Sequence, residues 1–319
     1  MIMKDTAMSH FPDFIIAGSA KSGTTALTMM LDQHPDTFMS TIKETNYFVH
    51  AYEPTRHLTD HRGNLVFGNQ DESDIIDTLP KYRSMFKDAS AGQILGEASP
   101  WYLINTEVPE RIKEHNDKTK IVIVLRNPSD VAFANFVHQV RDRGESFSLA
   151  DIDKIFEQDH YRKNDLHPFG QHLALPEYSR HLPSYLETFD PSQMYIMIYE
   201  EFLQNRRDSI GGLFEFLGVT NDVDIDVDKR VNISGLPKSE KVQDLIQGSM
   251  GMKKFIGLLV PKKPRRKIRA YIEALNTGEK AKMEDHIREK LDTLYTKDIE
   301  FVENIFGRNI SAWRSKRLV

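Results

Sequence analysis

Short apolar runs alternate with stretches of helical periodicity through the first two thirds of the chain. Four of the runs have the length and composition of buried strands, and they lie at residues 14–17, 93–96, 121–125 and 194–198. The third run is β-branched almost throughout, which is typical of a central strand in a parallel sheet. The pattern therefore predicts four strands.

Helices are predicted between these strands, because apolar residues recur there at helical spacing. The first helix follows Gly18 and carries Leu27, Met30 and Leu31 on one face. Pro35 ends it, because proline disfavours a helical conformation in the residue before it. The other helices are expected at about 105–115, 129–143, 176–189 and 207–217.

Alternating strands and helices predict an α/β fold with a mainly parallel central sheet flanked by helices. Beyond Val219 the strand signals stop, so residues 220–319 are expected to form a mostly helical C-terminal portion, most periodic at roughly 281–305. The polar stretch Arg56–Asp77 is expected to be a loop near the binding face. Since no internal repeat or linker divides the chain, we expect residues 1–319 to form a single domain.

Composition and charge narrow the class of protein. The chain has 42 basic and 47 acidic side chains, a balance that does not suggest a nucleic-acid partner. It has no cysteine, which excludes disulfides, thiolate metal sites and cysteine nucleophiles. Residues 1–10 lack the apolar core of a signal peptide, and no uncharged apolar stretch approaches the ~20 residues that cross a bilayer. We therefore expect a soluble, cytoplasmic protein.

The segment between the first strand and the first helix has the composition of an anion site. A helix N-terminus presents unpaired backbone N–H groups and the positive end of the helix dipole. Lys21 adds a full positive charge, and glycines let the backbone approach the anion closely. The remaining residues expected to contact it are Ser22, Gly23, Thr24 and Thr25. The segment predicts a phosphate site.

Two other interpretations fit this loop less well. An ordinary strand-to-helix turn would use the threonines as caps, but it would have no need of a lysine. A nucleoside-triphosphate P-loop requires Gly-Lys-Ser/Thr after four variable residues, whereas here Lys21 precedes Gly23. The order of these two residues turns the prediction away from ATP.

The order Lys21-Ser-Gly-Thr-Thr25 resembles the 5′-phosphosulfate loop of sulfotransferases that use 3′-phosphoadenosine-5′-phosphosulfate (PAPS). The likeness is to the bacterial and heparan-sulfate branch of that family. Further segments that resemble its motifs are Lys43–Phe48, Gly96–Tyr102, Leu125–Pro128, Tyr199–Phe202 and Phe306–Trp313. The resemblance spans nearly the whole chain. It implies the P-loop-like sulfotransferase fold and PAPS as sulfuryl donor, with adenosine 3′,5′-bisphosphate as product and no required metal.

The resemblance also implies catalytic roles. Lys21 would stabilise the charge that builds on the leaving phosphate during in-line transfer. Glu44 matches the general base of heparan-sulfate-type members, with a solvated or capping glutamate as the alternative. Lys43 would assist at the sulfonate or be a surface charge. His138 would line the acceptor cleft or be a structural histidine.

The segment after the third strand resembles the start of the family's 3′-phosphate site. Arg126 would bind that phosphate bidentately, with a structural ion pair as the alternative. Two family residues are missing, because Ala134 stands where a serine is usual and Val131 where an arginine is usual. Asn135 or Ser129 would then donate to the phosphate instead.

Three features of the later chain complete the expectations. Tyr199 matches an adenine-contacting tyrosine, with core packing as the alternative. Gly235 and Lys238 lie in a segment that resembles the loop closing over the nucleotide. The basic segment Lys253–Arg269 would hold an anionic acceptor, lie on a membrane surface, form a lid, or be a solvated helix face.

Three classes of function follow from these residues. The first is sulfuryl transfer from PAPS to a hydroxyl of a carbohydrate, lipid or small metabolite. The second is a small-molecule kinase with a related phosphate loop, which would need ATP and magnesium. The third is a non-catalytic nucleotide-binding relative, which Ala134 and Val131 make conceivable.

Overall fold

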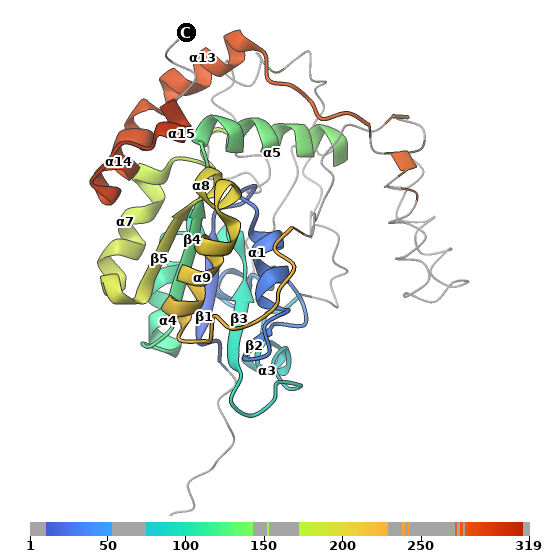
Figure 1. The fold of residues 1–319 in the computed structure, drawn as a ribbon, viewed down its shortest axis with the longest axis vertical. Coiled ribbons are helices and arrows are strands. Elements are labelled where there is room, and N and C mark those ends of the chain that lie inside the picture. The colour runs from blue at the N-terminus through green and yellow to red at the C-terminus, as the bar shows by residue number, and fades with distance from the viewer. Residues whose placement is uncertain are drawn as a thin grey trace, which may run out of the picture.

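The centre of the protein is a five-stranded parallel sheet (Figure 1). The computed structural model describes residues 11–52, 75–142, 152, 172–228, 238–239, 242, 272, 275–276 and 278–314. The strands are β1 Phe14–Gly18, β2 Thr37–Met39, β3 Ile94–Ala98, β4 Lys120–Leu125 and β5 Met194–Ile198, in the order β2-β3-β1-β4-β5. The predicted α/β fold with a mainly parallel sheet is confirmed.

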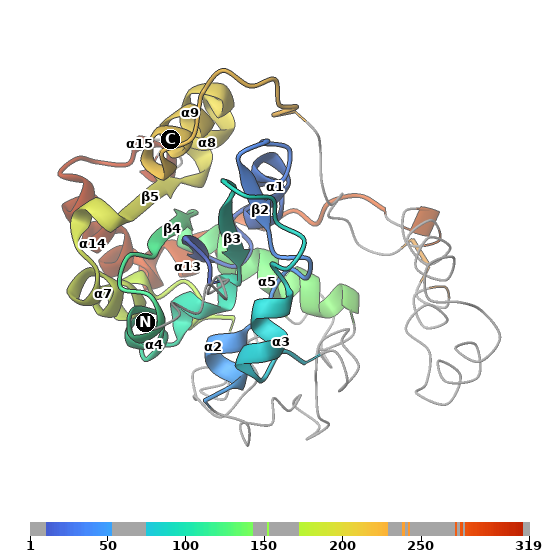
Figure 2. The same ribbon diagram turned by 90° about the horizontal axis from the view of Figure 1, so that it is seen from below.

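Alternate residues of each strand face opposite sides of the sheet, and helices cover both sides. Phe14 and Ile16 of β1 pack toward α1 and α9, whereas Ile15 packs toward α4, α7 and α14. The bounds of these helices are α1 Thr24–Leu31, α4 Val108–His115, α7 Tyr178–Thr188, α9 Arg206–Leu217 and α14 Thr296–Phe306. Figure 2 shows α1 and α9 on one side of the sheet and α4 and α7 on the other. Two buried cores result, one on each face.

A further layer lies across the carboxyl end of the sheet. The helix α5, Pro128–Asp142, starts three residues after β4 ends and packs against α13, Asp285–Leu294 (Figure 1). The periodic stretch predicted at roughly 281–305 is two helices, because α13 ends and α14 begins around Tyr295. The Tyr295 hydroxyl donates to the Leu173 carbonyl at 2.8 Å, which ties this break to the segment before α7.

Several short elements were not predicted. The strand β2 has only three residues, and it lies at the edge of the sheet directly after the first helix. The short helices are α2 Tyr47–His50, α3 Leu79–Ser84, η2 Pro100–Ile104, α8 Tyr199–Gln204, η6 Pro191–Gln193 and α15 Ser311–Arg314. A single turn carries too few residues to show a period, so packing rather than pattern determines these elements.

Some sequence-based expectations concern residues outside the described ones. These are Gly235, the basic segment Lys253–Arg269 and most of the stretch Arg56–Asp77. Within the part of the chain that the structure describes, no helix combines the length and the apolar character needed to cross a membrane.

Candidate active site

The predicted phosphate segments meet at the carboxyl edge of the sheet. The backbone N–H of Ser19, directly after β1, donates to the Val124 carbonyl of β4 at 2.8 Å. On the other side of β1, the N–H of Ser99 donates to the Ile16 carbonyl at 3.1 Å. Because the strands are parallel, the segments that follow β1, β3 and β4 all leave the sheet at one edge, where α/β folds bind ligands.

The loop after β1 turns sharply just before the start of α1, where an anion was predicted to bind. Lys21 has a φ of 62° and Gly23 a φ of 80°, so the chain turns twice through the left-handed region. Gly23 is the N-cap residue of α1 and offers no side-chain cap, which leaves the first N–H groups of the helix to a ligand. Ser22 is buried, and its hydroxyl lies 2.7 Å from that of Ser19. Thr24 is buried and Thr25 half-buried.

Arg126 joins the loop after β1 to the segment after β4. Its Nη1 donates to the Lys21 carbonyl at 2.9 Å, and its guanidinium carbon lies 5.3 Å from the centre of the Tyr199 ring. A guanidinium has five N–H donors, so the bond to Lys21 leaves donors for a phosphate. The structure thus brings together three residues predicted from separate motifs, Lys21, Arg126 and Tyr199.

Tyr199 also lies directly against Gly23. A Cβ atom built on Gly23 would come within 2.6 Å of Cε2 of the Tyr199 ring. The glycine is therefore required both by its positive φ and by the ring beside it. Tyr199 thus lies between the two predicted phosphate segments, and it also packs against the buried core on the α1 and α9 side of the sheet.

Replacing Gly23 with alanine is expected to weaken the binding of adenosine 3′,5′-bisphosphate about tenfold or more. The left-handed conformation alone costs a residue with a Cβ about 1–2 kcal/mol, and the displaced Tyr199 ring adds to it. Isothermal titration calorimetry measures the affinity. Gly218→Ala is the matched control, because Gly218 has a φ of 83° but its Cβ would meet nothing within 4 Å. An unchanged affinity in Gly23→Ala would contradict the placement of the ligand at this turn.

Glu44 is held on the segment that follows β2. Its φ is 60°, and its backbone N–H donates to the Ala98 carbonyl at the end of β3, at 2.9 Å. Two residues later the N–H of Asn46 donates to the Ser99 hydroxyl at 3.0 Å. Lys43 Nζ donates to Glu44 Oε1 at 2.6 Å, and both side chains are partly exposed. The Glu44 carboxylate is therefore accessible on a fixed backbone, with a lysine beside it.

A buried carboxylate, Glu97, holds this segment in place. Its Oε1 accepts hydrogen bonds from Thr45 Oγ1 at 2.9 Å and from the Ser99 hydroxyl, and its Oε2 accepts from the Tyr82 hydroxyl at 3.4 Å. Glu97 is fully buried, and burial raises its pKa to about 7 although these hydrogen bonds lower it. This role could not be predicted from the sequence, because Thr45 and Tyr82 are well separated from Glu97 along the chain.

The stability of the protein is expected to fall between about pH 4.5 and pH 7 through Glu97. In that range the unfolded chain ionises this carboxyl while the folded protein keeps it protonated, so a rise in pH favours unfolding. The loss is on the order of a few kcal/mol. Denaturant unfolding of the protein and of Glu97→Gln at pH 5 and pH 8 measures it. The free energy of unfolding of the wild type should fall from pH 5 to pH 8 by more than that of Glu97→Gln, which has no carboxyl to ionise at this position. An equal change in both proteins would refute the assignment.

The other predicted residues after β4 lie along α5. The Ser129 hydroxyl donates to Asp292 of α13 at 2.6 Å, so its proton is committed to that carboxylate. The amide nitrogen of Asn135, a buried residue, lies 2.9 Å from His172 Nδ1. Nη2 of Arg141 donates to His138 Nδ1 at 2.7 Å. Ser129, Asn135 and His138 thus contact Asp292, His172 and Arg141, respectively.

The contacts of Val131 and of Lys238 are also defined by the structure. Val131, which replaces the family's arginine, is buried in an apolar cluster with Ala20, Trp101 and Leu175. This cluster has no place for a charge, so the position supports the loop after β1 by packing. Lys238 Nζ donates to the Leu275 carbonyl at 3.2 Å.

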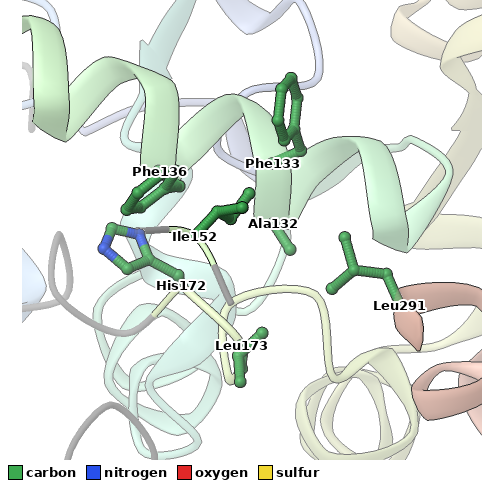
Figure 3. A pocket seen from close by; sticks show the side chains of 7 residues that line it. All are labelled: Ala132, Phe133, Phe136, Ile152, His172, Leu173 and Leu291. Atoms are coloured by element: carbon green, nitrogen blue, oxygen red, sulfur yellow. The ribbon is translucent and has the colours of Figure 1, made fainter. Parts of the chain in front are cut away.

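A small apolar pocket lies beside α5, near Asn135 (Figure 3). Its lining residues are Ala132, Phe133, Phe136, Ile152, His172, Leu173 and Leu291. Figure 3 shows the His172 ring next to Phe136, at one end of the pocket. Among the described residues that line the pocket, His172 is the only one with a polar side chain, and its ring contacts the Asn135 amide.

The chain was compared with curated proteins. Mouse bifunctional heparan sulfate N-deacetylase/N-sulfotransferase 4 is 25% identical over 223 residues, which are 68% of this chain and 23% of that protein. Human heparan sulfate glucosamine 3-O-sulfotransferase 6 is 26% identical over 219 residues, which are 66% of this chain and 53% of that protein. The chain thus matches about a quarter to a half of the length of these relatives.

Solved structures and family models identify the fold and the family of the chain. A crystal structure of a sulfotransferase from Alicyclobacillus acidocaldarius has the same fold, with a TM-score of 0.69 at 24% identity, over 95% of this chain and 99% of that one. The family model described as sulfotransferase domain matches residues 11–295. Because this match covers most of the sequence, the chain belongs to the sulfotransferase family.

Proposed function

We propose that the protein transfers a sulfuryl group from PAPS to an acceptor hydroxyl. One observation carries the proposal beyond the family: Arg126 donates to the carbonyl of Lys21, so the two predicted phosphate segments are joined. A donor with a phosphosulfate at one end and a 3′-phosphate at the other needs cationic groups at two linked points. Lys21 and Arg126 supply them.

The residues present fit such a donor. The turn at Gly23 has no Cβ, and the free N–H groups at the start of α1 suit the 5′-phosphosulfate, with Ser22, Thr24 and Thr25 as hydroxyl donors. The Arg126 guanidinium suits the 3′-phosphate, and the Tyr199 ring suits the adenine. When bound, PAPS supplies an activated sulfuryl group whose leaving group is adenosine 3′,5′-bisphosphate.

The protein's own groups would act by charge and by proton transfer. Glu44 takes the proton of the acceptor hydroxyl as the acceptor oxygen bonds to sulfur. The bond between sulfur and the bridging oxygen breaks, and Lys21 stabilises the electron pair left on that oxygen. Lys43 is paired with Glu44, so its role is to orient that carboxylate or to assist at the sulfonate.

Carbohydrates are the first class of acceptor to test. One curated relative is named a heparan sulfate glucosamine 3-O-sulfotransferase, which supports a sugar hydroxyl as the acceptor of this chain too. Lipids and small metabolites are the other classes to test, because loops set acceptor specificity in enzymes.

The experiment that tests the function is an acceptor screen with ³⁵S-labelled PAPS, read by mass spectrometry of the products. Transfer to any acceptor would exclude a non-catalytic nucleotide-binding role. Calorimetry with adenosine 3′,5′-bisphosphate and with ADP, each in EDTA and again with magnesium, distinguishes a sulfotransferase from a small-molecule kinase. We expect metal-independent binding of the bisphosphate in preference to ADP; tighter binding of ADP that requires magnesium would refute the proposal.

A further inference from the structure

The hydroxyl of Tyr178 lies at the junction of the two predicted phosphate segments. It donates to the Arg126 carbonyl at 2.8 Å and accepts from the Arg126 N–H at 3.2 Å. The Ser19 hydroxyl, in the loop after β1, lies 3.4 Å away. Tyr178 is fully buried, and burial raises the pKa of its hydroxyl, so the proton it donates is kept at all ordinary pH values.

A residue near the C-terminal end of the described chain packs against Tyr178. Its ring stacks on Trp313 of α15, with ring centres 6.2 Å apart. The indole N–H of Trp313 donates to Glu200 Oε2 at 2.7 Å, and Glu200 Oε1 accepts from the Asn127 N–H at 3.0 Å. The backbone of Arg126 and Asn127 is thus fixed by side chains from α7 and α8, with α15 behind them.

Fixing this backbone determines where the guanidinium of Arg126 can reach. Arg126 lies between the end of β4 at Leu125 and the start of α5 at Pro128. Its N–H and carbonyl are therefore outside the regular hydrogen bonding of the strand and of the helix. The Tyr178 hydroxyl pairs with both groups at once. A loss of this hydroxyl would leave two partly buried backbone groups without that partner, and the chain would shift to satisfy them.

We propose that Tyr178 is a positioning residue of the nucleotide site, which sets Arg126 for the 3′-phosphate and couples this segment to the loop after β1. This inference rests on the proposed function, because Arg126 must bind the 3′-phosphate for its position to matter. Tyr178 acts through Arg126 and does not itself contact the nucleotide.

The test compares two ligands that differ in the 3′-phosphate. Affinities for adenosine 3′,5′-bisphosphate and for adenosine 5′-monophosphate are measured by calorimetry, and their ratio reports the contribution of the 3′-phosphate. Tyr178→Phe keeps the ring and its stack on Trp313, and we expect it to lower the ratio about tenfold. Arg126→Ala should remove most of the ratio, and Tyr178→Phe added to it should cause no further loss.

A matched control lies on the same helix. Tyr185 of α7 is also fully buried, and its hydroxyl has no hydrogen-bond partner among the described residues. Tyr185→Phe should therefore leave the ratio unchanged. Since both ligands are titrated into one preparation, a loss of folded protein lowers both stoichiometries alike and does not alter the ratio.

Each outcome decides between the two proposals. A Tyr178→Phe ratio equal to that of the wild type, with a low ratio in Arg126→Ala, would overturn the positioning role and leave the proposed function standing. A wild-type ratio in Arg126→Ala would overturn both the role of Arg126 and the inference built on it. If Tyr178→Phe lowers the ratio further when it is added to Arg126→Ala, Tyr178 acts by a route that does not pass through Arg126. That result would also overturn the inference.

Discussion

Replacing Lys21 with alanine is expected to lower the rate of sulfuryl transfer about 100- to 1000-fold, the usual cost of removing one charge-stabilising donor. Lys21 lies in the turn before α1, and Arg126 holds its carbonyl. Its ammonium group would face negative charge on the bridging oxygen that is larger in the transition state than in the bound donor. The effect should therefore fall mainly on turnover.

Transfer from labelled PAPS to an acceptor found in the screen measures this effect. Lys81→Ala is the control, because Lys81 is an exposed lysine that contacts Asp77 and the Ile75 carbonyl. Turnover of Lys21→Ala within a few-fold of the wild type would show that another group neutralises the leaving phosphate.

Glu44→Gln is expected to lower turnover about 100- to 10,000-fold, the range for loss of a general base. Glutamine has nearly the same shape as glutamate, and the backbone bond from residue 44 to Ala98 does not involve the side chain. The segment should keep its conformation, so the affinity for adenosine 3′,5′-bisphosphate should not change. The substitution removes the ability to accept a proton, together with the negative charge that pairs with Lys43.

Turnover and calorimetry on one preparation separate these two effects. Glu107→Gln is a suitable control, because Glu107 is an exposed carboxylate paired with Arg111 on α4. A fully active Glu44→Gln enzyme would show that the base assignment is wrong, and His138 would be tested next. A loss of nucleotide affinity instead of turnover would assign Glu44 to donor binding.

The parts of the fold that are encoded locally could be predicted from the sequence. The runs around β1, β4 and β5 are apolar on both faces because helices cover both sides, and this determines their place in a parallel sheet. The edge strand β2 could not be found in this way, because three residues show no alternation. The break at Tyr295 was also hidden, since its partner is the distant Leu173 carbonyl.

The residues of the candidate site also differ in how far they could be predicted from the sequence. Lys21 and Arg126 follow apolar runs directly, so the fold class alone brings them to one edge of the sheet. Glu97 and Tyr178 act through partners far along the chain, and a single glutamate or tyrosine gives no periodic signal. Val131 shows the limit of a motif, because in this chain its position is packed in an apolar cluster.

The stack of Tyr178 on Trp313 bears on the order in which the protein is made. The strand β1 and the loop that contains Lys21 leave the ribosome well before Trp313, which is among the last described residues. Until then Glu200 lacks its indole donor and the Tyr178 ring lacks its cover. The candidate site thus reaches its final form only after Trp313 has been synthesised, although the loop that contains Lys21 is synthesised long before it.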